Sequence, residues 1–242
     1  MMQNKPRATK KYYFTALMAL GLFCSLPLFA ENINLLYSQA FAIADLSALD
    51  ISLDYEELHI SQIYGDEISI EIESNNINRL PQVQVEEGVL TIKAAKARQT
   101  TRALRMEKGN VCRVFVYIPQ DFLPDTINVS MKAANFMAEV LRSKVSITLS
   151  STTGRIDILS CQTESLTLKN TKGNSTLQKI KVDYFDLRSS SGLIFAELDQ
   201  APLARSFIQN QTGKVQLYYP KDALLPQIDI SNKSGQTEII PF

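Results

Sequence analysis

The chain has 242 residues, of which 45% are hydrophobic and 21% charged, and its 25 basic residues balance 25 acidic ones. This composition is ordinary for a globular protein, and the lack of a basic excess excludes a general nucleic-acid-binding protein. Beyond residues 1–30, no stretch is long and apolar enough to span a membrane as a helix.

The chain begins with the features of a secretory signal peptide. Four basic residues between Lys5 and Lys11 precede an apolar run from Tyr12 to Ala30, which is the order of such a leader. We expect cleavage near Ala30 and export to the periplasm or cell surface. An uncleaved membrane anchor and lipid attachment at Cys24 are the alternatives. Cleavage would remove four basic residues, leaving 21 against 25 acidic ones and a net charge of −4.

Residues 31–126 predict a β-rich lead-in, which either caps the repeats that follow or forms their first irregular coils. The pattern is weak at 31–48, where we expect a short helix or cap between Ala40 and Leu49. Alternating apolar and polar residues then predict strands. These strands are at 49–53, 58–60, 68–72, 82–85, 89–92 and 111–118.

A basic segment at residues 93–108 interrupts this pattern, with six basic residues and one acidic residue. Such a positive patch could attract an anionic glycan, a lipid headgroup or a protein partner. The alternative is a solvated hairpin loop or a short surface helix. The candidate contact residues are Lys96, Arg98, Arg102 and Arg105.

A repeat runs through residues 127–242. Five polar runs end in glycine, and successive glycines lie 19, 19, 21 and 22 residues apart; a sixth, degenerate copy has Ala134 in place of glycine, 20 residues before the first. Self-similarity at this period predicts a repeat array. The glycines are Gly154, Gly173, Gly192, Gly213 and Gly235.

The residues around each glycine alternate in character. Positions seven and five before it, and two and four after it, hold 21 apolar residues in 24 slots, as expected of half-buried strands joined by a tight turn. We therefore predict an all-β fold, a β-solenoid or β-helix-like stack that is continuous with the lead-in. Serine, threonine and asparagine of the turns would form ladders on the outside. An antiparallel β-sandwich built from the same hairpins is the alternative.

Little in the sequence indicates catalysis. The single histidine, His59, lies on the outward side of its strand, and no nucleophile elbow or phosphate-binding glycine loop is present. The outward acids do not fall in one column on neighbouring coils, as a carbohydrate-cleaving β-helix would require. We therefore predict no enzyme, cofactor or metal. The cysteines of the exported chain, Cys112 and Cys161, are expected to be buried unpaired thiols, with a disulfide as the alternative.

Four outward slots of the repeats hold apolar residues: Met137, Leu193, Phe195 and Phe207. Exposed apolar clusters can mark contact surfaces. Leu193, Phe195 and Phe207 are therefore candidate partner contacts, unless residues 31–48 or a return loop cover them.

Several features together resemble a known family. A Gly-Val-Leu-Thr-Ile strand ends at Ile92, a Val-Phe-Val-Tyr-Ile-Pro segment ends at Pro119, and polar-Gly-x-hydrophobic units complete the chain. Over residues 45–240 this resembles the bacterial "putative adhesin" β-strand-repeat family, domain of unknown function 4097. The resemblance implies a β-helix-like fold and an envelope or surface location, and brings no catalytic residues. The glycines here are not followed by the aspartate of the commoner Ser-Gly-Asp turn.

We therefore expect an exported, non-enzymatic, adhesin-like protein whose rigid β-repeat surface binds an envelope protein or a glycan. One alternative is an accessory or sensor component of envelope stress signalling that holds a membrane-bound partner. A second alternative is a degenerate carbohydrate-active β-helix. Because an open stack end invites strand pairing, a homodimer is a further expectation.

Overall fold

The computed structural model describes residues 33–95, 111–221 and 227–242, and Ile33–Phe242 forms one compact unit. The predicted leader with its cleavage site at Ala30 and the four candidate cations from Lys96 to Arg105 lie outside the described residues. Apart from two single-turn 3-10 helices, η1 (Ile43–Asp45) and η2 (Ile77–Arg79), the regular elements of the described residues are β-strands.

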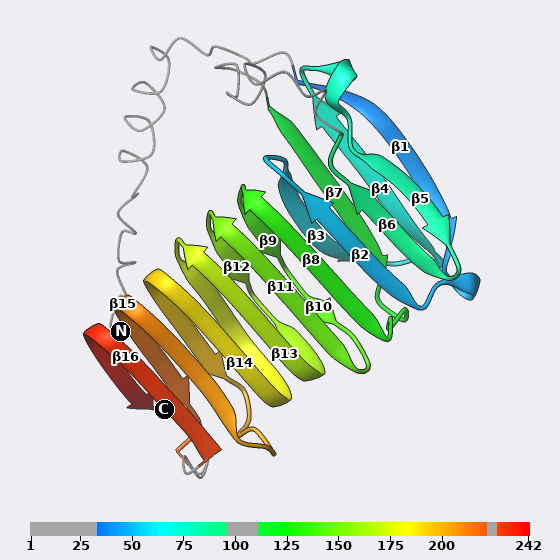
Figure 1. Ribbon diagram of the computed structural model, residues 1–242. Coiled ribbons are helices and arrows are strands. Elements are labelled where there is room, and N and C mark those ends of the chain that lie inside the picture. Colours follow the sequence, from blue (N-terminus) through cyan, green and yellow to red (C-terminus); the bar gives the residue numbers. More distant parts are fainter. Residues whose placement is uncertain (1–32, 96–110, 222–226) are drawn as a thin grey trace, which may run out of the picture. The chain divides into compact units, whose positions relative to one another are not determined.

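The strands divide into the lead-in and the repeats (Figure 1). The lead-in strands are β1 (Asn34–Ala42), β2 (Ala48–Leu53), β3 (Glu57–Ile63), β4 (Glu67–Ser74), β5 (Gln82–Glu86), β6 (Val89–Lys93) and β7 (Cys112–Pro119). The repeat strands are β8 (Thr126–Ala133), β9 (Phe136–Ala138), β10 (Leu141–Arg142), β11 (Ser146–Thr153), β12 (Ile156–Ile158), β13 (Cys161–Lys172), β14 (Ser175–Leu198), β15 (Ser206–Tyr219) and β16 (Ile228–Pro241).

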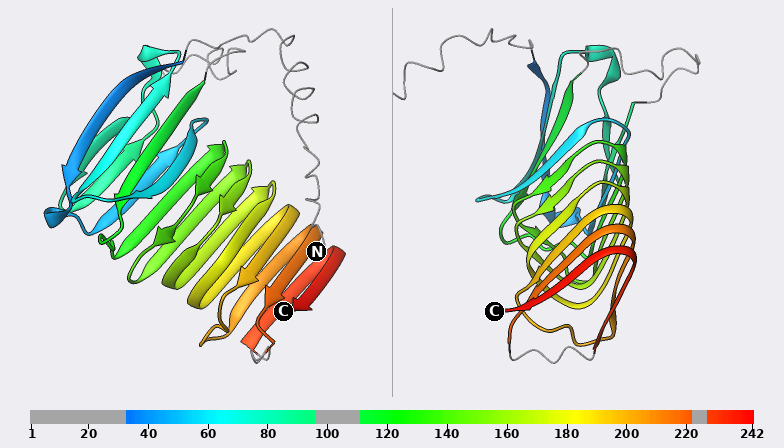
Figure 2. Two further views of the ribbon diagram at one scale, coloured as in Figure 1. Left: turned by 180° about the vertical axis from the view of Figure 1, so that it is seen from behind. Right: turned by 90° about the vertical axis from the view of Figure 1, so that its left-hand side faces the viewer.

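The repeats form a parallel stack. Each coil lies in register on the previous one, so that Ile147 of β11 pairs with Ile127 of β8 and with Leu166 of β13. Both views in Figure 2 show that each coil bends and returns on the other side of the stack. The repeat glycines have the positive φ that such a bend requires. We call the bend at each repeat glycine, or at Ala134 in the first copy, a corner. The first face consists of the strand segments before the corners, and the second face consists of those after them. This pairing confirms the predicted β-solenoid, and the alternative of an antiparallel sandwich is wrong.

The inward columns form the core of the stack. In the first five copies all twenty positions that the repeat predicts to point inward are buried. Two of these positions hold serine, and each hydroxyl is satisfied: Ser206 Oγ accepts from the Phe185 amide at 3.0 Å, and Ser175 Oγ accepts from the Asn170 side-chain amide at 3.2 Å. Burial of a polar group is inexpensive only when it is hydrogen-bonded in this way.

The sixth copy is less covered. Ile239 is 45% exposed, and Ile228 and Ile230 are half-buried. The reason is that β16 pairs with β15 on one side only, so no further coil covers its inner side chains.

The corners require glycine because consecutive coils approach closely there. Gly173 has φ of 137°, and a Cβ added to it would lie 2.0 Å from the carbonyl oxygen of Gly154. Beside the corner, Asn170 donates to that same carbonyl at 3.2 Å, and Asn210 donates to Gly192 O at 3.1 Å. Both asparagines are buried. The asparagine ladder expected on the outside therefore lies inside the corner, where it caps carbonyl groups.

The lead-in forms both the first coils and the cap of the stack. β2 and β3 pair in parallel with β8 and β9, with Leu49 opposite Ile127 and Leu58 opposite Phe136. β6 and β7 stack on these strands in parallel, and β5, β4 and β1 complete the sheet with antiparallel pairing. The short helix or cap expected between Ala40 and Leu49 is reduced to the single turn η1. The rest of this segment holds the end of β1, which pairs with the edge of β4, and the start of β2.

Candidate binding surfaces

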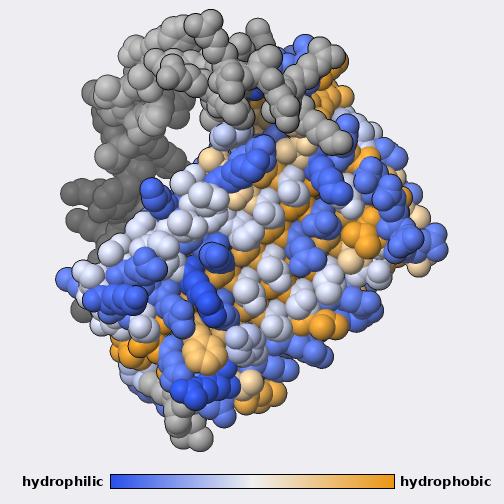
Figure 3. Space-filling view, viewed as in Figure 1, coloured by the Kyte–Doolittle hydropathy of each residue, from blue (hydrophilic) through white to orange (hydrophobic). Residues whose placement is uncertain are grey.

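The first face of the repeats presents two neighbouring outward rows of uniform chemistry, four and two residues before each corner. Of their twelve residues over six coils, four are basic and none is acidic. Figure 3 shows this face, with blue and pale residues projecting from the coils. The rows consist of Ser130, Lys132, Ser150, Thr152, Lys169, Thr171, Arg188, Ser190, Gln209, Gln211, Ser231 and Lys233.

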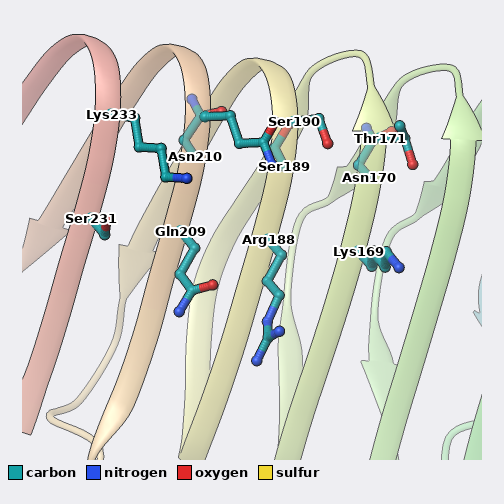
Figure 4. Close-up of a pocket in the computed structure, with 11 residues that line it drawn as sticks. Lys169, Asn170, Thr171, Arg188, Ser189, Ser190, Gln209, Asn210, Ser231 and Lys233 are labelled. Atoms are coloured by element: carbon teal, nitrogen blue, oxygen red, sulfur yellow. The ribbon is translucent and has the colours of Figure 1, made fainter.

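Between these rows lies a groove of about 410 Å³ that crosses β13, β14, β15 and β16. Eleven residues line it, all polar and none acidic. We call it the cationic groove because Lys169, Arg188 and Lys233 are among its lining residues. In Figure 4 Lys169, Arg188 and Gln209 project from three neighbouring strands, and Lys233 extends from β16 toward the preceding strand, β15.

The three cations of the groove differ in their surroundings. The guanidinium of Arg188 is held by the carboxylate of Asp186, with N–O distances of 2.6–2.9 Å, and this carboxylate raises the pKa of Arg188. An arginine has five N–H donors, and these bonds use Nε and one Nη2 hydrogen. The remaining donors have no partner among the described residues. Lys169 and Lys233 form no ion pair within the described part of the chain.

The floor of the groove contains polar atoms that the protein itself does not satisfy. Asn170 and Asn210 line the groove and donate their side-chain amide hydrogens to corner carbonyls of the preceding coils. Their Oδ1 atoms are buried and have no hydrogen-bond partner among the described residues. The floor has a regular backbone, because Asn170 pairs with Ser189 and Ser189 pairs with Asn210 on neighbouring strands.

The structure separates the apolar candidates that the sequence suggested. Leu193 and Phe195 follow their corner glycine and lie on the second face, whereas Phe207 precedes its glycine and lies on the first face, opposite Asp186 of β14. All three are half-buried. The Phe195 ring lies 5.2 Å from that of Tyr218, and the Arg205 guanidinium lies 5.8 Å from the Phe207 ring. The Tyr184 ring of the preceding coil also lies 6.5 Å from the Phe207 ring, so side chains of adjoining coils contact both Phe195 and Phe207. β1, which holds half of residues 31–48, pairs with β4 in the lead-in instead.

Few groups of the described residues are suited to catalysis. His59 stacks on Phe115, with ring centroids 5.1 Å apart. Both Cys112 and Cys161 are free thiols, as expected, but only Cys161 is buried and Cys112 is half-buried. Burial raises the pKa of each thiol to about 12, which keeps it protonated and unreactive at neutral pH. No three histidine, cysteine, aspartate or glutamate side chains in this part of the chain lie close enough together to hold a metal ion.

Sequence reasoning missed the cationic groove. It counted the outward polar residues but did not follow single rows from coil to coil. The signal was present, because two positions of each repeat never carry an acid. Among the residues described, no helix has the length and apolar character needed to cross a membrane.

A parallel β-solenoid with glycine corners and an antiparallel cap defines the class of fold. Residues 46–217 match the family model Toastrack DUF4097. Because that match spans more than half of the chain, the protein belongs to the Toastrack DUF4097 family, as the sequence resemblance indicated.

Two solved structures share the fold. One is a "putative adhesin" from Bacteroides fragilis NCTC 9343, with a TM-score of 0.56 and 16% identity, covering 84% of this chain and 96% of its own. The other is a "putative cell adhesion protein" from Clostridium sporogenes ATCC 15579, with a TM-score of 0.51 and 12% identity, covering 85% of this chain and 99% of its own. At these identities the likeness shows the fold alone. No curated protein matches the chain.

Proposed function

We propose that this chain is an exported, non-enzymatic, adhesin-like protein of the bacterial envelope that binds its partner on the first face of the solenoid. The observation that carries the proposal is the cationic groove, which crosses four strands and is lined by polar and basic residues alone. Such a site offers hydrogen bonds and charge but no acid–base pair that could cleave a bound molecule.

Two further observations support it. The apolar run from Tyr12 to Ala30, preceded by basic residues, has the form of an export signal. The adhesin-like names of the two solved structures fit a surface location, and the parallel pairing sets the backbone positions of the outward rows. A preorganised backbone loses little conformational entropy on binding, which suits a binding surface.

The location can be tested by proteinase K treatment of intact cells that produce the chain with a C-terminal tag. We expect the chain to be shorter than its primary product and to be degraded on intact cells or released with the periplasmic fraction. A full-length chain in the cytosol would contradict the proposal. The purified chain should release no reducing ends from envelope polysaccharides, and turnover would overturn the non-enzymatic part.

A further inference from the structure

We propose that the cationic groove binds an acidic polysaccharide whose strand runs across the coils, from β13 to β16. This inference rests on the proposed function and names the class of ligand. Its basis is the chemistry of the groove, the spacing of its rows and the rigidity of its walls.

The lining chemistry selects a ligand with both hydroxyl groups and negative charges. Gln209, Thr171 and Ser190 can donate to or accept from sugar hydroxyls. Lys169, Arg188 and Lys233 can each bind a carboxylate or sulfate through charge-assisted hydrogen bonds. With no acid in the lining, nothing in the groove repels such a ligand.

The lining also argues against other polymers. No aromatic ring lines the groove, whereas single-stranded nucleic acids bind by stacking their bases on aromatic side chains. It contains no apolar or aromatic pocket of the kind that anchors a protein partner. A neutral glycan would leave Lys169 and Lys233 without a charged partner among the described residues.

The geometry fits an extended polymer. Neighbouring strands lie about 4.8 Å apart, so Lys169 on β13 and Ser231, the residue in register with it on β16, are separated by three strand spacings, roughly 14 Å. Lys233 lies two residues further along β16. Within that span Arg188 and Gln209 lie in register on the two intervening strands. The ligand therefore meets one polar side chain of the row at each strand, at a spacing comparable to that of successive sugars.

Arg188 is held in place before any ligand binds. Its ion pair with Asp186 fixes the guanidinium and leaves Nη1 free to donate. The bidentate contact that Arg188 makes with Asp186 also means that it contributes less net charge than Lys169 and Lys233. We therefore expect the two lysines to dominate the affinity and its dependence on salt.

The experiment is isothermal titration of the purified mature chain with an oligogalacturonate, a heparin oligosaccharide, a neutral dextran fragment of similar length and poly-L-glutamate. We expect one or both acidic oligosaccharides to bind, more weakly at higher salt, and dextran not to bind. The carboxylate and sulfate arms identify which anionic group is preferred. Binding of poly-L-glutamate as tight as that of the oligosaccharides would overturn the proposal, because it would show a general site for acidic chains.

Variants assign the binding to the groove. Lys169→Glu and Lys233→Glu should each lower the affinity about tenfold or more, as expected for loss of a charge-assisted contact. Lys181→Glu is the matched control, since Lys181 is exposed on β14 outside the groove and the charge change is the same. Melting temperatures establish that each variant is folded, and Lys169→Gln and Lys233→Gln replace any variant that is not.

Equal affinities for the groove variants and the control would overturn the proposal, as would no binding of either acidic oligosaccharide. Failure here with a positive result in the protease experiment would leave the proposed surface function standing. A cytosolic location together with groove-dependent glycan binding would contradict the proposed export and support the proposed ligand of the groove.

Discussion

At the scale of single residues, the corner of each coil is the most constrained place in the molecule. The backbone of one corner contacts the backbone of the next, so that the space a side chain would need is filled by a carbonyl group. Inside the same corner Asn170 and Asn210 satisfy carbonyl groups that the turn removes from the regular ladder. A buried polar ladder and a glycine ladder are therefore two consequences of one close contact.

Gly173→Ala should destabilise the protein strongly. The new Cβ would lie 2.0 Å from Gly154 O, and the residue would have to keep a φ of 137°, a strain that alone costs about 1–3 kcal/mol. Gly65→Ala is a matched control, because Gly65 has φ of 146° but no atom within 4 Å of an added Cβ. Urea unfolding of both variants measures the contribution of the contact. Equal losses of stability in the two variants would show that contact between coils is not the reason why position 173 requires glycine.

Cys161 should make stability fall in alkaline solution. Its pKa is raised by burial from 9.0 to about 12 in the folded protein. Because the folded pKa is the higher one, the stabilisation is fully present below pH 9 and is lost as the pH rises from 9 toward 12. Relative to Cys161→Ala, the wild type should lose about 2 kcal/mol between pH 8 and pH 10.5. Denaturant unfolding at the two pH values checks this, and a difference independent of pH would contradict it.

At the scale of elements, the coils vary in length between their paired strands and keep the strands themselves in register. Gly192 pairs directly with Gly213, and Gly213 with Gly235, although the spacings of 21 and 22 exceed the earlier 19. The additional residues therefore lie in sequence after Leu198, where β14 ends, and after Tyr219, where β15 ends. This explains why the repeat is exact in register but irregular in length.

Much of this architecture was predictable from alternation and glycine spacing. The six lead-in strands, the inward columns and the stacking of repeats all followed from the sequence, because each is a local pattern. The position of β2 and β3 could not be predicted from the sequence. The coil that they form lies inside the sheet, with β6 and β7 on one side and β8 and β9 on the other. Pairing between strands distant in sequence leaves no periodic signal.

The candidate sites were harder to predict for the same reason. Phe207 and Phe195 look alike in the sequence pattern, but the corner at Gly192 or Gly213 places such residues on different faces. The cationic groove depends on which rows are adjacent, and that requires the register of β13 to β16. Alternation alone gives only whether a residue points inward or outward.

The inner residues of successive coils should differ in their contribution to stability. Ile208 on β15 is fully buried, whereas Ile230, which pairs with it from β16, is half-buried. Ile208→Ala should cost about 2–5 kcal/mol, the usual loss for a buried isoleucine. Ile230→Ala should cost less than about 2 kcal/mol, because part of its surface is already in water. Thermal or urea unfolding compares the two, and a larger loss for Ile230→Ala would indicate that another surface covers β16.

At the scale of the whole molecule, a solenoid has stability that varies along its axis. Each coil contacts only its neighbours, so stability is approximately a sum of terms for coils and for their interfaces. The two ends of the stack differ. β1 pairs antiparallel with β4 at the lead-in end, while β16 at the other end is bonded to β15 alone and keeps its inner isoleucines partly exposed.

This asymmetry predicts the order in which backbone amides exchange with deuterium. Amides of β16 should exchange first, because opening the last coil breaks one interface and exposes few buried side chains. Amides of β13 and β14, which have coils on both sides and a fully buried core, should exchange last. Hydrogen exchange followed by mass spectrometry resolves these segments, and Ile230→Ala should accelerate exchange in β16 while leaving β13 unchanged. If all segments exchanged at one rate, opening would be global, and the contacts between neighbouring coils would not be independent steps.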